Sequence, residues 1–129
     1  MLFSYYQDTN CAIVYLSDHG EEVYDYRDQW GRLQNADDAR QTSSYHQEPM
    51  FVWLSDVYKL RYPQVVQQIQ AACHRPFLTT DISQLLFSLR HLETSLYQSE
   101  RDLLSSDYVP SRRVLLDGRD YDAIIARKG

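Results

Sequence analysis

The 129-residue chain alternates short apolar runs with longer polar stretches, and two of the apolar runs predict strands. They span Cys11–Leu16 and Met50–Leu54. Neither run alternates apolar and polar side chains, which is typical of strands covered on both faces, as in a parallel sheet. Pro49 precedes the second run, where a missing N–H is tolerated.

Two helices are predicted between residues 63 and 92. Pro63 suits a first helical position, and the helix is expected to stop near residues 73–74, before Pro76. Its apolar stripe has helical spacing and consists of Val65, Val66, Ile69 and Ala72. Thr80 or Asp81 caps the second helix. Its expected buried face consists of Ile82, Leu85, Leu86, Leu89 and Leu92.

The remaining segments carry weaker patterns. Residues 21–47 are polar and aromatic without a sustained period, which predicts a long loop with one helical turn at Ala36–Arg40. A loop of this length is unusual unless it is functional or disordered, and its place after the first strand favours an active-site rim. Arg113–Leu116 predicts a short strand, and residues 121–125 are expected either to pair back as a hairpin or to form a loose tail.

These elements indicate one α/β domain over residues 1–129, with a mostly parallel sheet flanked by helices. The net charge of −5 argues against a nucleic-acid-binding surface, which would be basic. It leaves a phosphate-handling site open, since a bound cation reverses the local charge. Cys11 and Cys73 are expected to be buried free thiols, with a disulfide left open until their separation is known.

No apolar run approaches the roughly 20 residues that span a bilayer, and residues 1–6 lack the features of a signal peptide. The chain by itself is therefore expected to be soluble, and either cytoplasmic or a piece of something larger.

Asp18 and His19 carry the candidate chemistry. They follow the first predicted strand, and open α/β sheets bind ligands just beyond the carboxyl ends of their strands. A carboxylate and an imidazole are both zinc ligands. The alternative is a solvated strand end in which Asp18 caps the next turn, and the dipeptide alone favours it.

Four segments, in order, resemble the phosphoethanolamine transferases, membrane enzymes with a sulfatase-like catalytic domain of the alkaline phosphatase superfamily. They are SDHGEEVYD (17–25), EPMFVWLS (48–55), RPFLTTDI (75–82) and SRRVL (111–115) with DYD at 120–122. The resemblance covers nearly the whole chain, but only the C-terminal part of that catalytic domain. It implies a partial alkaline-phosphatase or sulfatase-like fold with Asp18 and His19 as zinc ligands.

The resemblance also implies an activity. In the family a threonine attacks phosphatidylethanolamine and passes phosphoethanolamine to an acceptor such as the lipid A or core sugar of lipopolysaccharide. The catalytic domain faces the periplasm and is tethered to the inner membrane by N-terminal helices. The chain is thus expected to be a C-terminal fragment, and its contact with the membrane to run through an N-terminal part absent here.

The chain departs from the family pattern in two ways. Its threonines all lie outside the sequence context of the nucleophile, so this chain alone is expected to be inactive. Where the family often has a second histidine, residues 30–32 are Trp-Gly-Arg; Arg32 is a candidate phosphate contact, and His46 a candidate substitute. Glu21 and Glu22 are candidates for orienting His19 around a metal.

Two other functions stay open: a sulfatase or phosphodiesterase of the same superfamily, and a non-catalytic remnant that acts as a binding module. Two ligands alone predict weak zinc binding at most. A truncated sheet has exposed edges, which predicts a homodimer.

Overall fold

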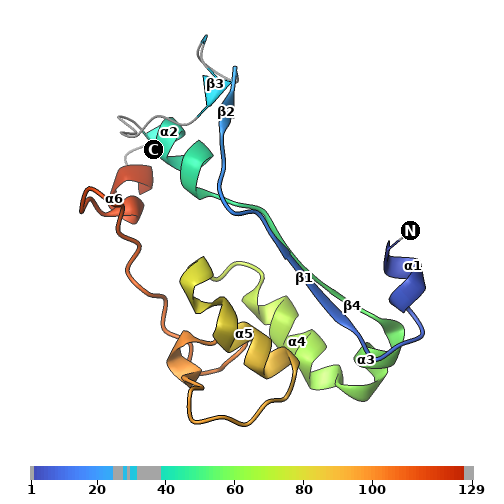
Figure 1. The fold of residues 1–129 in the computed structure, drawn as a ribbon. Helices are drawn as coiled ribbons and strands as arrows, with labels where there is room; N and C mark the ends of the chain where they lie inside the picture. Colours follow the sequence, from blue (N-terminus) through green and yellow to red (C-terminus); the bar gives the residue numbers. More distant parts are fainter. Residues whose placement is uncertain (1, 25–27, 29, 32–38, 127–129) are drawn as a thin grey trace. The chain divides into compact units, whose positions relative to one another are not determined.

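The computed structural model in Figure 1 describes residues 2–24, 28, 30–31 and 39–126. The chain divides into two units. Unit 1 comprises Met1–Ile13 and Val52–Ser111, and unit 2 comprises Val14–Phe51 and Arg112–Gly129.

Strands β1 (Ala12–Leu16) and β4 (Met50–Leu54) form a two-stranded sheet where the apolar runs predicted strands. The Ser55 N–H donates to the Cys11 carbonyl (3.0 Å), and the Ser17 N–H donates to the Pro49 carbonyl (3.3 Å). The first bond joins the end of β4 to the start of β1, and the second joins the end of β1 to the start of β4. The strands therefore run antiparallel, and the expected parallel direction is wrong for this pair. The expected burial of both faces is wrong as well, since Tyr15 of β1 and Phe51 of β4 are exposed and stack on each other with their ring centroids 5.0 Å apart. An unbroken apolar run carries no information about strand direction.

The helices of unit 1 begin with α1 (Leu2–Tyr6), α3 (Asp56–Arg61) and α4 (Pro63–Ala72). The 3₁₀ turn η1 (Thr79–Asp81), α5 (Ile82–Leu89) and the 3₁₀ turn η2 (Ser99–Arg101) follow. The structure confirms both predicted helices, with Pro63 as the first residue of α4 and Asp81 as the cap residue of α5.

Helix α5 ends earlier than its apolar stripe predicts. The Leu92 N–H donates to the Phe87 carbonyl and the His91 N–H donates to the Ser88 carbonyl, the paired bonds of a Schellman motif. His91 takes the left-handed conformation of this motif, with φ 52°, where glycine is usual. Leu92 therefore leaves the helical face and is exposed, as is Leu86.

The core of unit 1 is apolar and continuous with the chain that follows α5. Its buried apolar residues are Leu54, Tyr58, Val65, Ala72, Leu85, Leu89, Leu103 and Leu104. Arg75 donates to the carbonyl oxygens of Leu103 and Ser105, both at 2.7 Å. Arg75 follows the end of α4 closely, so these two bonds anchor the irregular segment around residues 103–105 to that end of the helix. Both cysteines are free as predicted, but neither is buried: Cys11 is half-buried and Cys73 is exposed.

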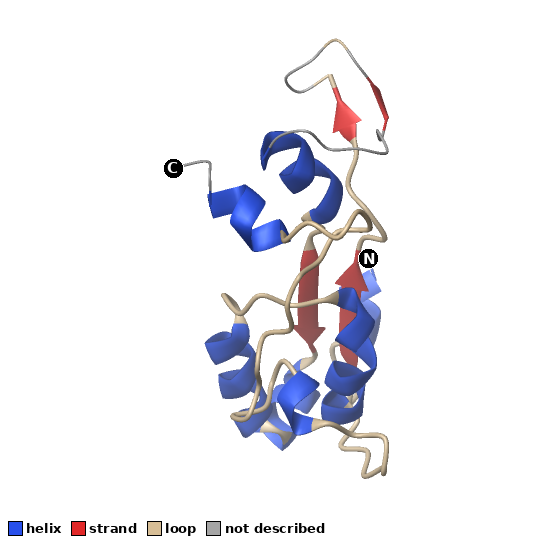
Figure 2. Ribbon diagram, turned by 90° about the vertical axis from the view of Figure 1, so that its left-hand side faces the viewer, coloured by secondary structure: helices blue, strands red, loops and turns tan. Residues whose placement is uncertain are grey.

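Unit 2 contains β2 (Glu22–Val23), β3 (Trp30–Gly31), α2 (Ala39–His46) and α6 (Tyr121–Ala126). Strands β2 and β3 pair antiparallel, and α2 packs against α6, as Figure 2 shows. Helix α2 therefore occupies the end of the segment 21–47, which the sequence predicted to be a long loop. Residues 36–38 of the predicted helical turn lie outside the described residues. The predicted strand at 113–116 is reduced to one bridge between Val114 and Asp120.

Residues 121–126 form a helix, so the expectation of a hairpin or loose tail is wrong. The Asp120 carboxylate accepts the Ala123 N–H at 3.0 Å and caps this helix. Tyr121 is buried, and its ring lies 6.5 Å from that of His46 in α2. Packing against α2 accounts for a helix too short to form alone.

Candidate functional site

Asp18 and His19 lie in unit 2, directly after β1 on the segment that leads to β2. The His19 N–H donates to Asp18 Oδ1 and the Ser17 hydroxyl donates to the His19 carbonyl, both at 3.0 Å. These bonds fix the local backbone so that His19 Nε2 lies 3.7 Å from Asp18 Oδ2. The two side chains therefore converge at an exposed strand end.

The orientation of the His19 ring determines which nitrogen can bind a metal. Nδ1 lies 3.3 Å from the Gly20 carbonyl oxygen. A carbonyl can only accept, so this contact requires the hydrogen on Nδ1 and leaves a lone pair on Nε2 of the neutral ring. That lone pair faces a carboxylate oxygen. Two acceptors held together in this way are stabilised by a proton or a cation between them.

The spacing of the pair suits a shared zinc ion. Ligands at about 2.0–2.2 Å from a tetrahedral Zn²⁺ lie roughly 3.3 Å from each other. The observed 3.7 Å needs only a small side-chain adjustment, and Asp18 is 89% exposed and free to make it. Asp18 and His19 therefore fit as two members of a zinc ligand set.

Within the described residues, Asp18 and His19 are not joined by further metal-ligand side chains. No group of three or more His, Cys, Asp or Glu side chains in the described part of the chain could hold a metal ion. Glu21 is exposed, while the Glu22 side chain and all of Arg32 lie outside the described residues. Their assigned roles stay predictions.

His46 lies in the last turn of α2 and is half-buried. Its Nδ1 is 3.1 Å from the Thr42 carbonyl, and its ring packs near Tyr121. Burial raises the pKa of Tyr121, only partly offset by the Arg113 guanidinium, whose Cζ lies 4.6 Å from the centroid of its ring. His46 thus contributes to the contact between α2 and α6, and its role toward a substrate stays a prediction.

Comparison with known proteins places this geometry in a family. The sulfatase family model matches residues 2–86. The chain belongs to the sulfatase family. This sulfatase-family segment includes β1, the Asp18–His19 pair, β4 and α4, and it ends within α5 (Ile82–Leu89).

Solved structures agree on the fold. The crystal structure of the C-terminal periplasmic domain of EcEptC from Escherichia coli is similar, with a TM-score of 0.74 and 22% identity over 93% of this chain. The same domain in complex with Zn gives a TM-score of 0.68 and 23% identity over 89% of this chain. The chain spans about a third of those domains, 34% and 32% respectively. These likenesses show a partial sulfatase-like fold, as the sequence predicted.

Two further observations are negative. No curated protein matches the chain. Among the described residues, no helix combines the length and apolar character that a membrane crossing requires.

Proposed function

We propose that this chain is the C-terminal part of the catalytic domain of a zinc-dependent phosphoethanolamine transferase. The Asp18–His19 pair carries the proposal, because it sits at the end of a strand in a sulfatase-family fold with its two free acceptor atoms converging. Three further segments resemble the same enzymes in the same order. The zinc complex of the similar E. coli domain supports the choice of metal.

In this proposal Asp18 Oδ2 and His19 Nε2 hold the metal, and the Gly20 carbonyl keeps the imidazole in the tautomer that binds it. Bound Zn²⁺ would lower the pKa of a nucleophilic hydroxyl and neutralise charge on the phosphoryl oxygens. The threonine nucleophile and the remaining ligands come from outside these 129 residues. Phosphatidylethanolamine is the donor and a lipopolysaccharide-type sugar is the acceptor, reached from the periplasmic face of the inner membrane.

The test is transfer by the longest reading frame that contains these residues. Asp18→Asn and His19→Gln should each abolish the modification of lipopolysaccharide by phosphoethanolamine, measured by mass spectrometry, and lower the zinc content of the purified protein. Glu21→Gln serves as a graded control: a residue that only orients His19 should lower zinc affinity by about 10–100-fold without removing the site. Undiminished modification in Asp18→Asn would overturn the proposal.

The isolated chain gives a second test. Two ligands without the rest of the set should bind Zn²⁺ weakly, so calorimetric titration should show no submicromolar, stoichiometric binding. The same full-length protein assayed with an aryl sulfate separates a transferase from a sulfatase, since only the latter releases sulfate. Homodimerisation through strand edges stays a prediction, to be checked by light scattering.

A further inference from the structure

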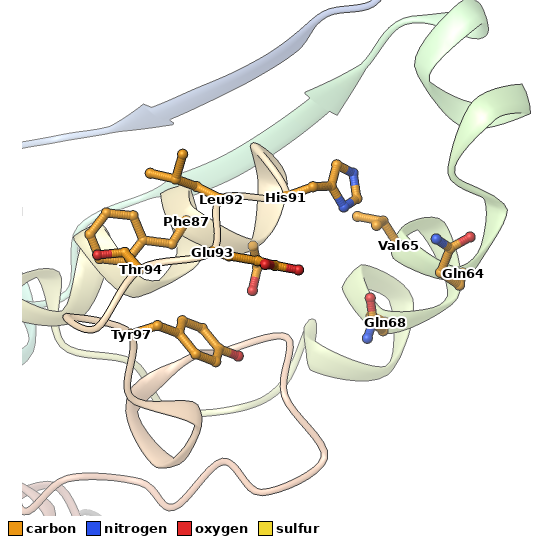
Figure 3. A pocket seen from close by; sticks show the side chains of 10 residues that line it. Gln64, Val65, Gln68, Phe87, His91, Leu92, Glu93, Thr94 and Tyr97 are labelled. Carbon is orange, nitrogen blue, oxygen red and sulfur yellow. The ribbon is translucent and has the colours of Figure 1, made fainter.

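A pocket of about 540 Å³ lies within unit 1, between α4 and the chain that follows α5. Figure 3 shows Gln64 and Gln68 of α4 across the pocket from Glu93 and Tyr97. Val65, also in its lining, is part of the unit 1 core. The pocket has the size of a small-molecule site, and neither the sequence resemblance nor the Asp18–His19 pair accounts for it.

The loop that forms one wall of this pocket is held in place from behind. The buried Gln84 side chain donates to the Leu96 carbonyl (3.3 Å) and accepts the Gln98 N–H (2.8 Å). The Gln84 side chain thus binds the backbone on both sides of Tyr97. The wall is preorganised, which reduces the entropy lost when a ligand binds.

A buried carboxylate lies directly behind the pocket lining. Asp102 is 1% exposed, and its Oδ2 accepts hydrogen bonds from the Ser88 hydroxyl (2.5 Å) and the Tyr97 hydroxyl (2.8 Å). Its Oδ1 accepts the Leu104 N–H at 3.1 Å. Partial burial and the bond to Asp102 raise the pKa of Tyr97, so its phenol stays protonated.

These bonds decide what the pocket can offer a ligand. The Ser88 and Tyr97 hydroxyls each have one hydrogen, and both hydrogens are donated to Asp102. Their oxygens keep acceptor lone pairs, and the Tyr97 oxygen also interacts with the Ser88 and Ser105 hydroxyls. The Glu93 carboxylate and the amide oxygens of Gln64 and Gln68 are acceptors as well, and the donors in the lining are the two glutamine NH2 groups and the Thr94 hydroxyl.

The titratable groups that line the pocket are Glu93, His91 and Tyr97, and the His91 ring packs on Tyr62 with the ring centroids 3.9 Å apart. Glu93 is the charged lining residue, and neither lysine nor arginine is among the described residues that line the pocket. Within the described chain neither Glu93 nor Asp102 forms an ion pair. Asp102 lies outside the lining and is satisfied by its three hydrogen bonds, so these two negative charges act on the pocket through the potential they create, which favours a cation over an anion.

We propose that this pocket binds a small organic cation, a primary ammonium group on a short hydrocarbon chain. An ammonium has three donors and no acceptor, which suits the Glu93 carboxylate and the amide oxygens of Gln64 and Gln68. The rings of Phe87 and Tyr97 suit a cation as well. Val65 and Leu92 provide apolar surface for the hydrocarbon part, which a bare metal ion would not use. The site does not depend on the proposed transferase activity.

The test is a titration of the 129-residue chain with n-butylammonium chloride, followed by two-dimensional ¹H–¹⁵N NMR. Saturable shifts are expected for the amides of residues 91–98. Sodium n-butyrate, of the same shape and opposite charge, should cause none, and potassium chloride at equal ionic strength should cause none that saturates. A response that butyrate or potassium reproduces would overturn the proposal, as would the absence of saturation with butylammonium.

Glu93→Gln is the decisive variant because Glu93 is exposed and its replacement leaves the core intact. The dissociation constant for butylammonium should rise about tenfold, the worth of one hydrogen bond to a charged group. Glu100→Gln removes the same charge from an exposed residue outside the pocket lining and should leave the constant unchanged. Equal constants for Glu93→Gln and the unaltered chain would contradict the site.

Discussion

The Ser55 hydroxyl donates a hydrogen bond to the Thr9 carbonyl oxygen, 2.5 Å away, and so joins the start of α3 to the N-terminal segment. The same oxygen accepts the N–H groups of Cys11 (3.2 Å) and Tyr58 (3.0 Å). One fully buried side chain therefore satisfies three backbone groups and caps a helix.

Removing the Ser55 hydroxyl should lower the free energy of unfolding more than removing the hydroxyl of an exposed serine does. Ser55→Ala leaves buried backbone groups without partners, and we expect the free energy of unfolding to fall by about 1–3 kcal/mol. Chemical denaturation followed by circular dichroism measures the change. Ser106→Ala, at an exposed loop position, should stay within about 0.5 kcal/mol of the unaltered chain. Equal effects of the two substitutions would contradict the assigned role.

Asp102 should be coupled energetically to Ser88. Asp102→Ala removes the acceptor of two hydroxyls, and we expect a loss of about 1.5–3 kcal/mol in the free energy of unfolding. Once Asp102 is gone, Ser88→Ala should cost less than it does alone, so a double-mutant cycle should give a nonzero coupling energy. Strict additivity would mean that the short hydrogen bond contributes nothing.

The buried Tyr58 predicts a loss of stability in alkali. Burial, followed by the neighbouring Tyr62, raises the pKa of Tyr58 above its usual value of 10.0. The unfolded chain then loses the phenolic proton at lower pH than the folded chain does. Stability from this group is complete below about pH 10 and is lost as the pH rises through the folded pKa. Tyr58→Phe should flatten this decline in denaturation midpoints measured from pH 8 to 11; an unchanged slope would argue against it.

The effect of replacing His91 on stability should depend on whether the new residue accepts the left-handed backbone conformation, more than on whether it is polar. Its φ of 52° suits asparagine but is strained for a β-branched residue. His91→Val should therefore lower the free energy of unfolding by roughly 1–2 kcal/mol more than His91→Asn does. Both variants lose the ring contact with Tyr62, whose centroid lies 3.9 Å away, so the difference isolates the backbone term. Thermal denaturation of the two, compared directly, gives the answer, and equal stability would rule out the conformational explanation.

The sequence located the elements whose formation depends on local chemistry. Pro63 and Asp81 mark helix starts through backbone constraints and capping, which act within a few residues. The end of α5 was missed because His91 adopts a conformation normally assigned to glycine. Strand direction in the β1–β4 pair depends on partners some forty residues apart along the chain, which an apolar run does not specify.

The position of the candidate site could also be predicted from the sequence, but its surroundings could not. Asp18 and His19 follow a strand, and their position could be inferred from the order of elements. Helix α6 could not, because its stability comes from packing Tyr121 against α2 rather than from its six residues. The pocket in unit 1 depends on Ser88 of α5 meeting Tyr97 and Asp102 from the irregular chain that follows, and no motif in the sequence marks such a meeting.

Residues 92–111 contain little regular structure beyond η2, yet Arg75, Gln84 and Asp81 hold them through side-chain bonds. A protease that searches for pliable loops should pass over this stretch, and its bonded amides should exchange with deuterium as slowly as those of a helix. Where a homologous protein lacks one of these three anchors, this segment should be the part that melts first.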